Sequence, residues 1–231
     1  MPILAYHRFG AVASDSMTVT TPVFASHLRR LREGGYTVIP LRQLVDHFLG
    51  NAPAPPPRSV VITADDGHRS VYTDMLPLVR QWEVPVTLFV YPSAISRADY
   101  ALTWDQLKAL QATGLFDVQS HTYWHPNFAR EKRRLAPAEY ARFVAFQLGH
   151  SREILRQRLG GPIDMLAWPF GIHDDALIRD AAAAGYVAGF TIDGRNATAA
   201  DRVMALPRHL MNDHDRGPAF DRLLSGPAVG K

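Results

Sequence analysis

Two adjacent carboxylates mark the part of the sequence best suited to chemistry. Asp65 and Asp66 end an apolar run over residues 60–64 and are followed by Gly67. A buried aspartate is costly unless it is paired or bound to a metal. Two of them where a core strand emerges therefore indicate a site at the mouth of a sheet or barrel. Asp-Gly is also a common turn signal, and on these residues alone a surface turn is an equal alternative.

A pair of histidines could complete such a site. His121 and His125 are four residues apart, and one helical turn would place them on the same side, suited to gripping one ion. Two partly exposed loop histidines beside Pro126 are the alternative interpretation. Joined by an aspartate from another strand end, the pair forms a two-His-one-carboxylate set with open positions, as zinc hydrolases and non-haem Fe(II) oxygenases use.

The second aspartate favours a hydrolase over an oxygenase. A hydrolase needs a base beside its metal to take a proton from the attacking water. Side chains of consecutive strand residues normally point to opposite faces of a sheet. We therefore expect Gly67 to let the chain turn, so that Asp65 and Asp66 both reach the mouth.

Composition sets the class of protein and excludes several others. The chain has 231 residues, 47% hydrophobic and 20% charged, as expected for a globular protein that forms a single domain over residues 1–231. The net charge is +3, and the basic residues are dispersed, which argues against a nucleic-acid partner. The absence of cysteine excludes disulfides, thiol nucleophiles and Cys-bound zinc. No apolar run is long enough to span a bilayer. No signal peptide is visible, so we expect either a cytoplasmic protein or the mature part of an exported one.

Strands and helices alternate along the chain about eight times. Because the predicted strands are apolar throughout, the pattern indicates an α/β fold with an all-parallel sheet covered by helices. No glycine-rich phosphate loop follows the first strand, which disfavours a dinucleotide-binding sheet. Strands are expected over residues 2–7, 36–41, 60–65, 85–90, 116–120, 165–168, 186–192 and 203–210, and helices over 21–33, 44–49, 71–82, from 104, 138–159 and 175–184.

Polar residues fall repeatedly at the C-terminal ends of these strands. In a (β/α) barrel those ends share one mouth, where the active sites of such folds lie. We therefore favour a barrel over an open sheet. The residues concerned are His7, Asp65, Asp66, His121, Phe170, Asp193 and Arg208.

Four segments resemble motifs of a known family. Residues 63–67, Thr-Ala-Asp-Asp-Gly, closely resemble the Thr-Phe-Asp-Asp-Gly motif of the polysaccharide deacetylases, the NodB-homology or carbohydrate esterase family 4 group. Residues 121–125 are similar to the second motif, His-Ser/Thr-x-x-His, and residues 168–171 to the third, Arg-x-Pro-Tyr/Phe. The opening Leu-Ala-Tyr-His of residues 4–7 resembles the subgroup that includes poly-N-acetylglucosamine deacetylases of biofilm systems.

The resemblance implies a fold, a reaction and roles for single residues. The fold would be a distorted (β/α) barrel with seven or eight parallel strands, and the reaction hydrolysis of N-acetyl groups on the N-acetylhexosamine units of a polysaccharide. Asp65 would be the general base, and the backbone N–H of Phe170 would help to hold the oxyanion. One divalent ion, zinc with cobalt or nickel as alternatives, would be held by Asp66, His121 and His125. An extracytoplasmic location also follows from the resemblance.

The chain departs from the family pattern around the acid and the base. The usual last motif is Leu-x-His, but here its third position is Arg208, and the histidine is displaced to His209. In the resembling subgroup the histidine of the N-terminal Tyr-His supplies the acid, so we prefer His7 to His209. The arginine that normally pairs with the base is replaced by Ala167. We expect Arg208 to take its place and keep Asp65 ionised.

Two alternatives stay open beside the deacetylase. The alanines at positions 64 and 167, where the family has phenylalanine and arginine, leave room for a barrel that binds glycans without turnover. The non-haem Fe(II) oxygenase is the other, and it would require a fold unlike a parallel barrel.

The polymer could be poly-N-acetylglucosamine, chitin, peptidoglycan or a capsular glycan. Tyr123, Trp124 and Trp168 are candidates either for sugar-stacking surfaces or for core packing.

Overall fold

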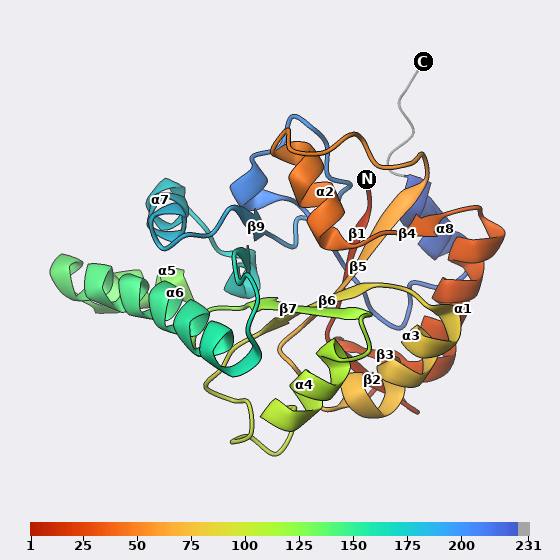
Figure 1. The fold of residues 1–231 in the computed structure, drawn as a ribbon, viewed down its shortest axis with the longest axis horizontal. Coiled ribbons are helices and arrows are strands. Elements are labelled where there is room, and N and C mark those ends of the chain that lie inside the picture. Colours follow the sequence, from red (N-terminus) through yellow and green to blue (C-terminus); the bar gives the residue numbers. More distant parts are fainter. Residues whose placement is uncertain (226–231) are drawn as a thin grey trace.

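In the computed structural model, which describes residues 1–225, an eight-stranded parallel sheet organises the chain (Figure 1). The strands are β1 (Ile3–Tyr6), β4 (Thr37–Val38), β5 (Ser59–Asp65), β6 (Val86–Val90), β7 (Phe116–Ser120), β8 (Met165–Ala167), β9 (Ala188–Phe190) and β10 (His209–Leu210). Seven of them follow the order β10-β1-β5-β6-β7-β8-β9, while β4 pairs with β5 off this path. The predicted α/β barrel of seven or eight parallel strands is confirmed.

The two ends of the sheet are joined by one short segment, residues 206–210. Leu206 bridges Phe190 in β9, and β10 pairs in parallel with β1. The N–H of Leu206 donates to Gly189 O at 2.8 Å, which fixes the segment against β9. The sheet therefore curls into a distorted barrel whose ends are linked by a few residues.

Side-chain alternation along each strand separates an inner core from an outer one. In β5, Val61 packs with inward residues of the other strands, such as Phe89 and Phe190. Val60 and Ile62 instead pack outward against the covering helices. The same alternation directs Thr63 and Asp65 into the barrel, because they share the parity of Val61.

Helices cover the outside of the sheet (Figure 1). They are α1 (Thr21–Glu33), α2 (Leu41–Phe48), α3 (Leu76–Trp82), α4 (Trp104–Gln111), α5 (Phe128–Arg134), α6 (Pro137–Leu159), α7 (Asp175–Ala183) and α8 (Pro218–Ser225). The sequence Thr-Trp-Asp-Gln at residues 103–106 predicts a capping box. The structure confirms it, since the Thr103 hydroxyl accepts from the N–H of Gln106 and the Gln106 side chain accepts from the N–H of Thr103. Figure 1 shows α5 and α6 projecting beyond the rest of the fold.

Several elements differ from the sequence-based expectations. The strand expected over residues 203–210 is wrong for most of its length: Val203–Ala205 form a 3₁₀ turn, and only His209–Leu210 pair as a strand. Pro207 lacks an N–H for a ladder, which accounts for the interruption. The helix expected over residues 71–82 opens as a π-helical turn, Val71–Met75.

Four elements were not expected from the sequence. The strands β2 (Arg8–Gly10) and β3 (Thr18–Thr20) pair in parallel as a small separate ribbon, and α5 and α8 are the two helices. The strands are too short for an alternating pattern to be visible in the sequence. Both helices are shorter than the ten to twelve residues at which periodicity becomes a reliable signal.

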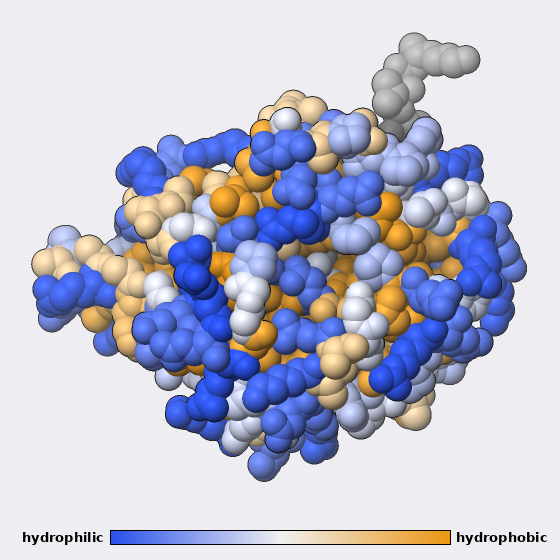
Figure 2. Space-filling view, in the orientation of Figure 1, coloured by the Kyte–Doolittle hydropathy of each residue, from blue (hydrophilic) through white to orange (hydrophobic). Residues whose placement is uncertain are grey.

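The surface is largely hydrophilic. Charged and polar residues cover most of the face shown in Figure 2, with hydrophobic residues visible between them. Within residues 1–225, no helix has the length and apolar character needed to cross a membrane.

Alanine substitutions at two glycines, one in β9 and one control in α6, test how closely neighbouring residues pack against β9. A Cβ on Gly189 would lie 2.3 Å from Met204 O and 2.7 Å from Trp168 Nε1, so Gly189→Ala must displace backbone. We expect it to lower the free energy of unfolding by about 1–3 kcal/mol or more. Gly149→Ala, within α6 and with nothing within 4 Å of the added Cβ, should raise it by about 0.5–1 kcal/mol. Urea unfolding of both variants checks this, and equal stability would contradict the close approach at Gly189.

Candidate active site

The turn after β5 brings two neighbouring carboxylates to the mouth of the barrel. Asp65 ends β5 and is only 1% exposed. Asp66 and Gly67 then both adopt left-handed backbone conformations, with φ of 71° and 70°. These two left-handed residues reverse the alternation of side-chain directions along the strand, so that Asp65 and Asp66 both reach the mouth. The turn was expected to depend on Gly67, but it begins one residue earlier, at Asp66. A Cβ on Gly67 would lie 3.0 Å from Val90 Cγ1, so glycine is required there.

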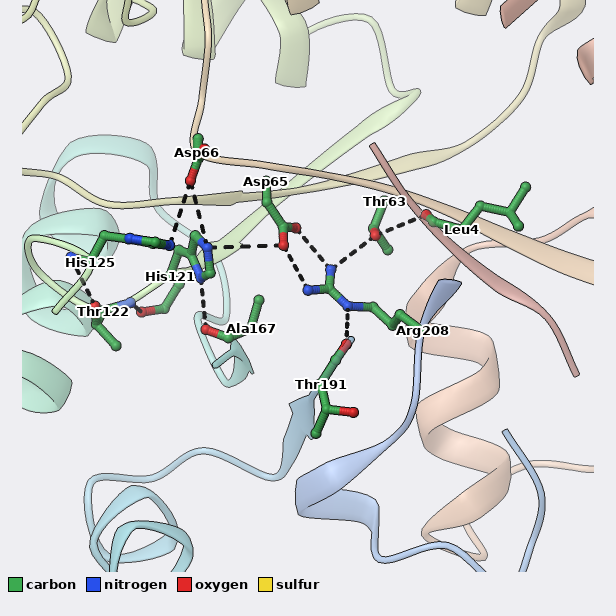
Figure 3. A network of polar contacts seen from close by, with 11 residues as sticks. Leu4, Thr63, Asp65, Asp66, His121, Thr122, His125, Ala167, Thr191 and Arg208 are labelled. Carbon is green, nitrogen blue, oxygen red and sulfur yellow. Dashed lines mark hydrogen bonds and ion pairs between the residues drawn. The ribbon is translucent and has the colours of Figure 1, made fainter. Parts of the chain in front are cut away.

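A buried arginine forms an ion pair with Asp65 (Figure 3). Arg208 is fully buried, and its two terminal nitrogens donate to the two carboxylate oxygens of Asp65 at 2.8 and 2.6 Å. The guanidinium also donates to Thr63 Oγ1 at 3.1 Å and to Thr191 O at 3.0 Å. Burial alone would raise the pKa of Asp65, but the charge and hydrogen bonds of Arg208 outweigh it and hold that pKa well below its usual range. The carboxylate is therefore ionised.

The two histidines meet Asp66 through a tight turn. The helical turn expected for His121 and His125 is wrong, because Thr122 and His125 have left-handed φ values of 64° and 61°. Their Nε2 atoms nevertheless lie 3.7 and 3.8 Å from Asp66 Oδ1 (Figure 3). The three possible ligand atoms all lie within 4.8 Å of one another. This is the only such group among residues 1–225.

The geometry and protonation of this group fit a divalent ion. Two ligands about 2.0–2.2 Å from a common ion lie roughly 3.3–3.6 Å apart, close to the separations found. His121 Nδ1 donates to Ala167 O at 2.8 Å, which leaves the Nε2 lone pair directed at the group. Burial, assisted by the neighbouring His125, lowers the pKa of His121 to about 3, and burial also lowers that of His125. Both rings are therefore neutral and able to act as ligands.

His7 and His209 lie on opposite sides of the barrel wall. His7 lines the same cavity, of about 500 Å³, as the two aspartates and the two site histidines. Its Nδ1 is buried without a hydrogen-bond partner. Burial lowers the pKa of His7, against the raising effect of Asp65 and Asp66. His209 does not line this cavity, and its Nε2 lies 2.9 Å from Asn196 Oδ1.

Phe170 forms one rim of the cavity. It is 55% exposed, and its ring centre lies 4.6 Å from that of His125. Its φ is 57°, so it joins Asp66, Thr122 and His125 in the left-handed region. These are four of the seven non-glycine residues with that conformation in residues 1–225. Such strain gathers where the surrounding structure fixes a functional geometry.

The aromatic candidates differ in how far their side chains are buried. Trp168 is 1% exposed, and its Nε1 donates to Met204 O, so its side chain belongs to the core. Trp124 is 47% exposed. The cavity residues that were not singled out from the sequence include Tyr91, Arg8 and Met17. Tyr91 directly follows β6, so the strand-end criterion could have found it. The other two lie at the β2–β3 ribbon, which has no sequence signal.

Comparison with known proteins gives one family. The sequence profile of the family "Polysaccharide deacetylase" matches residues 52–189. The poly-beta-1,6-N-acetyl-D-glucosamine N-deacetylase of Escherichia coli (strain K12) is 25% identical over 244 residues, which cover 90% of this chain and 36% of that protein. The chain thus spans about a third of that relative's length.

Solved structures share the fold along nearly the whole chain. The Streptococcus pyogenes deacetylase PplD, determined in complex with acetate, superimposes with a TM-score of 0.86 at 21% identity, covering 97% of both chains. IcaB from Ammonifex degensii gives 0.81 at 25% identity, covering 96% of both.

The Arg208–Asp65 pair generates a prediction about stability. Arg208→Met leaves Asp65 buried without a partner, and we expect it to lower the free energy of unfolding by about 3–5 kcal/mol at neutral pH. Arg202→Met, which removes a pair with Asp175 whose side chains are 60% and 71% exposed, should leave stability nearly unchanged.

The cost of Arg208→Met should also depend on pH. Without the guanidinium, burial raises the pKa of Asp65 above the unfolded value of 3.8, so the folded variant binds a proton that the unfolded chain does not. The variant's deficit should therefore be smaller at pH 5 than at pH 8. Urea unfolding at both values, with Arg202→Met as control, measures it. A deficit independent of pH would mean that Arg208 acts by packing alone.

Proposed function

This chain belongs to the polysaccharide deacetylase family, and from that premise we propose that residues 1–231 form one domain that hydrolyses N-acetyl groups on the N-acetylhexosamine units of a polysaccharide with the help of a metal ion. The observation that carries the proposal is the convergence of Asp66, His121 and His125 beside the arginine-paired Asp65. A ligand set with an ionised carboxylate next to it suits metal-assisted hydrolysis. The oxygenase alternative required another fold and is not supported.

Asp66, His121 and His125 would hold the ion, which we propose to be zinc. A divalent ion bound there would lower the pKa of water in its coordination sphere toward roughly 7 and polarise the acetyl carbonyl. One carboxylate and two neutral imidazoles are the donors that zinc accepts in catalytic sites, with a position left for substrate. The backbone hydrogen bond from His121 fixes its ring for this purpose.

Proton transfer is assigned to Asp65 and His7. Asp65 is kept ionised by Arg208 and lies 3.9 Å from His121 Nε2, so it can accept the proton of a water attacking at the ligand set. The sugar nitrogen cannot leave as an anion, so an acid must protonate it. We assign His7 to this step because it lines the cavity, whereas His209 does not. The low pKa that burial gives His7 makes its protonated form a stronger acid.

The remaining assignments concern charge and substrate. The backbone N–H of Phe170 would donate to the developing oxyanion at the cavity rim. Poly-beta-1,6-N-acetyl-D-glucosamine, the substrate in the name of the Escherichia coli relative, is the polymer that we propose. A polymer of this kind in a biofilm or cell envelope would place the enzyme outside the cytoplasm.

Variants of the two aspartates separate base from ligand. We expect Asp65→Asn to retain the metal and to lower acetate release from β-1,6-linked N-acetylglucosamine oligosaccharides by about 10²–10⁴-fold, the usual contribution of a general base. Asp66→Ala and His121→Ala should lose both metal and activity. Metal content by elemental analysis and acetate release with zinc, cobalt or nickel test this. Full activity of Asp65→Asn would refute the base, and a metal-replete Asp66→Ala protein would refute the ligand.

The two histidines provide a matched pair for the acid. We expect His7→Ala to lower kcat for acetate release by about 10²-fold or more, because the leaving nitrogen loses its proton donor. His209→Ala should retain activity, since its side chain lies outside the cavity. The reverse result, with only His209→Ala inactive, would assign the acid to His209.

A further inference from the structure

Most of the exposed large apolar side chains lie in or beside segments that follow the C-terminal ends of strands. Seven such residues are found among residues 1–225. Leu49, at the end of α2, and Val187, just before β9, lie elsewhere. The other five lie in segments that follow β2, β6, β7 and β8, or on the helix packed against one of them. They are Val12, Tyr100, Trp124, Phe146 and Phe170. Exposed apolar groups concentrated in one region mark a binding surface.

Two of these side chains belong to a cluster of aromatic rings beside the loop that carries His121 and His125. We call this cluster the aromatic ledge. The ledge consists of Trp124 and Phe146, which are 47% and 48% exposed, and of three half-buried rings that support them, Tyr123, Phe143 and His150. Tyr123 and Trp124 belong to the same loop as His121 and His125. The other three members lie on α6 at positions 143, 146 and 150, which share one helix face. The ledge thus shares the loop that carries two of the proposed metal ligands.

The supporting rings hold the exposed ones in fixed orientations. Trp124 packs edge-on against Phe143 with ring centres 6.1 Å apart. Phe146 packs edge-on against Tyr123 at 5.1 Å and stacks on His150 at 4.8 Å. The backbone N–H of Trp124 donates to the side-chain oxygen of Gln147, which is 1% exposed. Because the rings are positioned in advance, binding would cost little conformational entropy.

We propose that this ledge binds sugar units of the same polysaccharide beyond the unit being deacetylated. The inference rests on the proposed function and adds a surface to it. The C–H faces of a pyranose ring are apolar and carry a slight positive charge, so they pack on the negative face of an aromatic ring. The ledge presents aromatic rings and no exposed large aliphatic side chain, which suits a sugar better than a protein partner or a lipid. A helix rises 1.5 Å per residue, so positions 143 to 150 extend over roughly 10 Å, enough to contact more than one sugar.

Chain-length dependence tests the ledge. We would measure kcat/KM for acetate release from β-1,6-linked N-acetylglucosamine dimers and pentamers, and compare their ratio between variants. Phe146→Ala and Trp124→Ala should lower the pentamer-to-dimer ratio roughly tenfold each, as expected for removal of an anchoring ring. Trp124→Phe should retain most of it. Val187→Ala, an exposed apolar residue at the opposite end of the barrel, is the matched control and should leave the ratio unchanged.

Direct binding separates this inference from the proposed function. Pentamer binding to the Asp65→Asn protein, followed calorimetrically, should weaken roughly tenfold when Phe146→Ala is added. Unchanged pentamer binding and an unchanged ratio would overturn the ledge while leaving deacetylation intact. An equal loss for dimer and pentamer would also overturn it, because it would indicate damage to the site itself. Absence of both binding and acetate release would refute the proposed function and the ledge with it. Self-association that is abolished by Phe146→Ala would assign the surface to a second copy of the chain instead.

Discussion

The buried ion pair between Asp65 and Arg208 is the interaction on which the rest of the structure depends. A carboxylate that is 1% exposed stays ionised only because both of its oxygens accept from a guanidinium that is itself fully buried. That guanidinium also donates to Thr63 in β5 and to Thr191 beyond β9. Arg208 therefore ties the segment that links the barrel ends to the strand that carries Asp65. The link between the ends of the barrel and the ionisation of Asp65 therefore depend on the same side chain.

The other site residues are organised around this pair by backbone conformations that are individually unfavourable. Left-handed residues at Asp66, His125 and Phe170 turn side chains toward the cavity that regular strand or helix geometry would direct elsewhere, and the left-handed Thr122 accepts from the N–H of His125. Each such residue costs on the order of 1 kcal/mol or more. The loops can hold them because short, well-packed connections join them to a rigid sheet. The consequence is a ligand set and a base whose positions depend little on side-chain rearrangement.

The parts of the site that could be predicted are those that depend on local pattern. Apolar runs ending in polar residues placed Asp65, His121 and His7 at strand ends, and strand parity explains why Arg208 points inward while His209 points outward. The capping box at Thr103 was equally visible. What could not be predicted depends on contacts between distant residues. The left-handed turn at His125, the 3₁₀ turn before β10 and the bridge from Leu206 to Phe190 follow from packing across the barrel. The ribbon that brings Arg8 and Met17 to the cavity is likewise too short to be visible in the sequence.

The place of Arg208 in the chain has a consequence for biosynthesis. It lies 143 positions after Asp65, so most of the sheet is made before the partner of this carboxylate leaves the ribosome. Until then, the nascent barrel contains a carboxylate that burial penalises, and its two ends lack the segment that links them. A chain interrupted before residue 208 would have nearly all of its strands without a stable centre. A stable barrel can therefore form only after residue 208 has been made, and chains interrupted before it would present an open, weakly held sheet to cellular proteases.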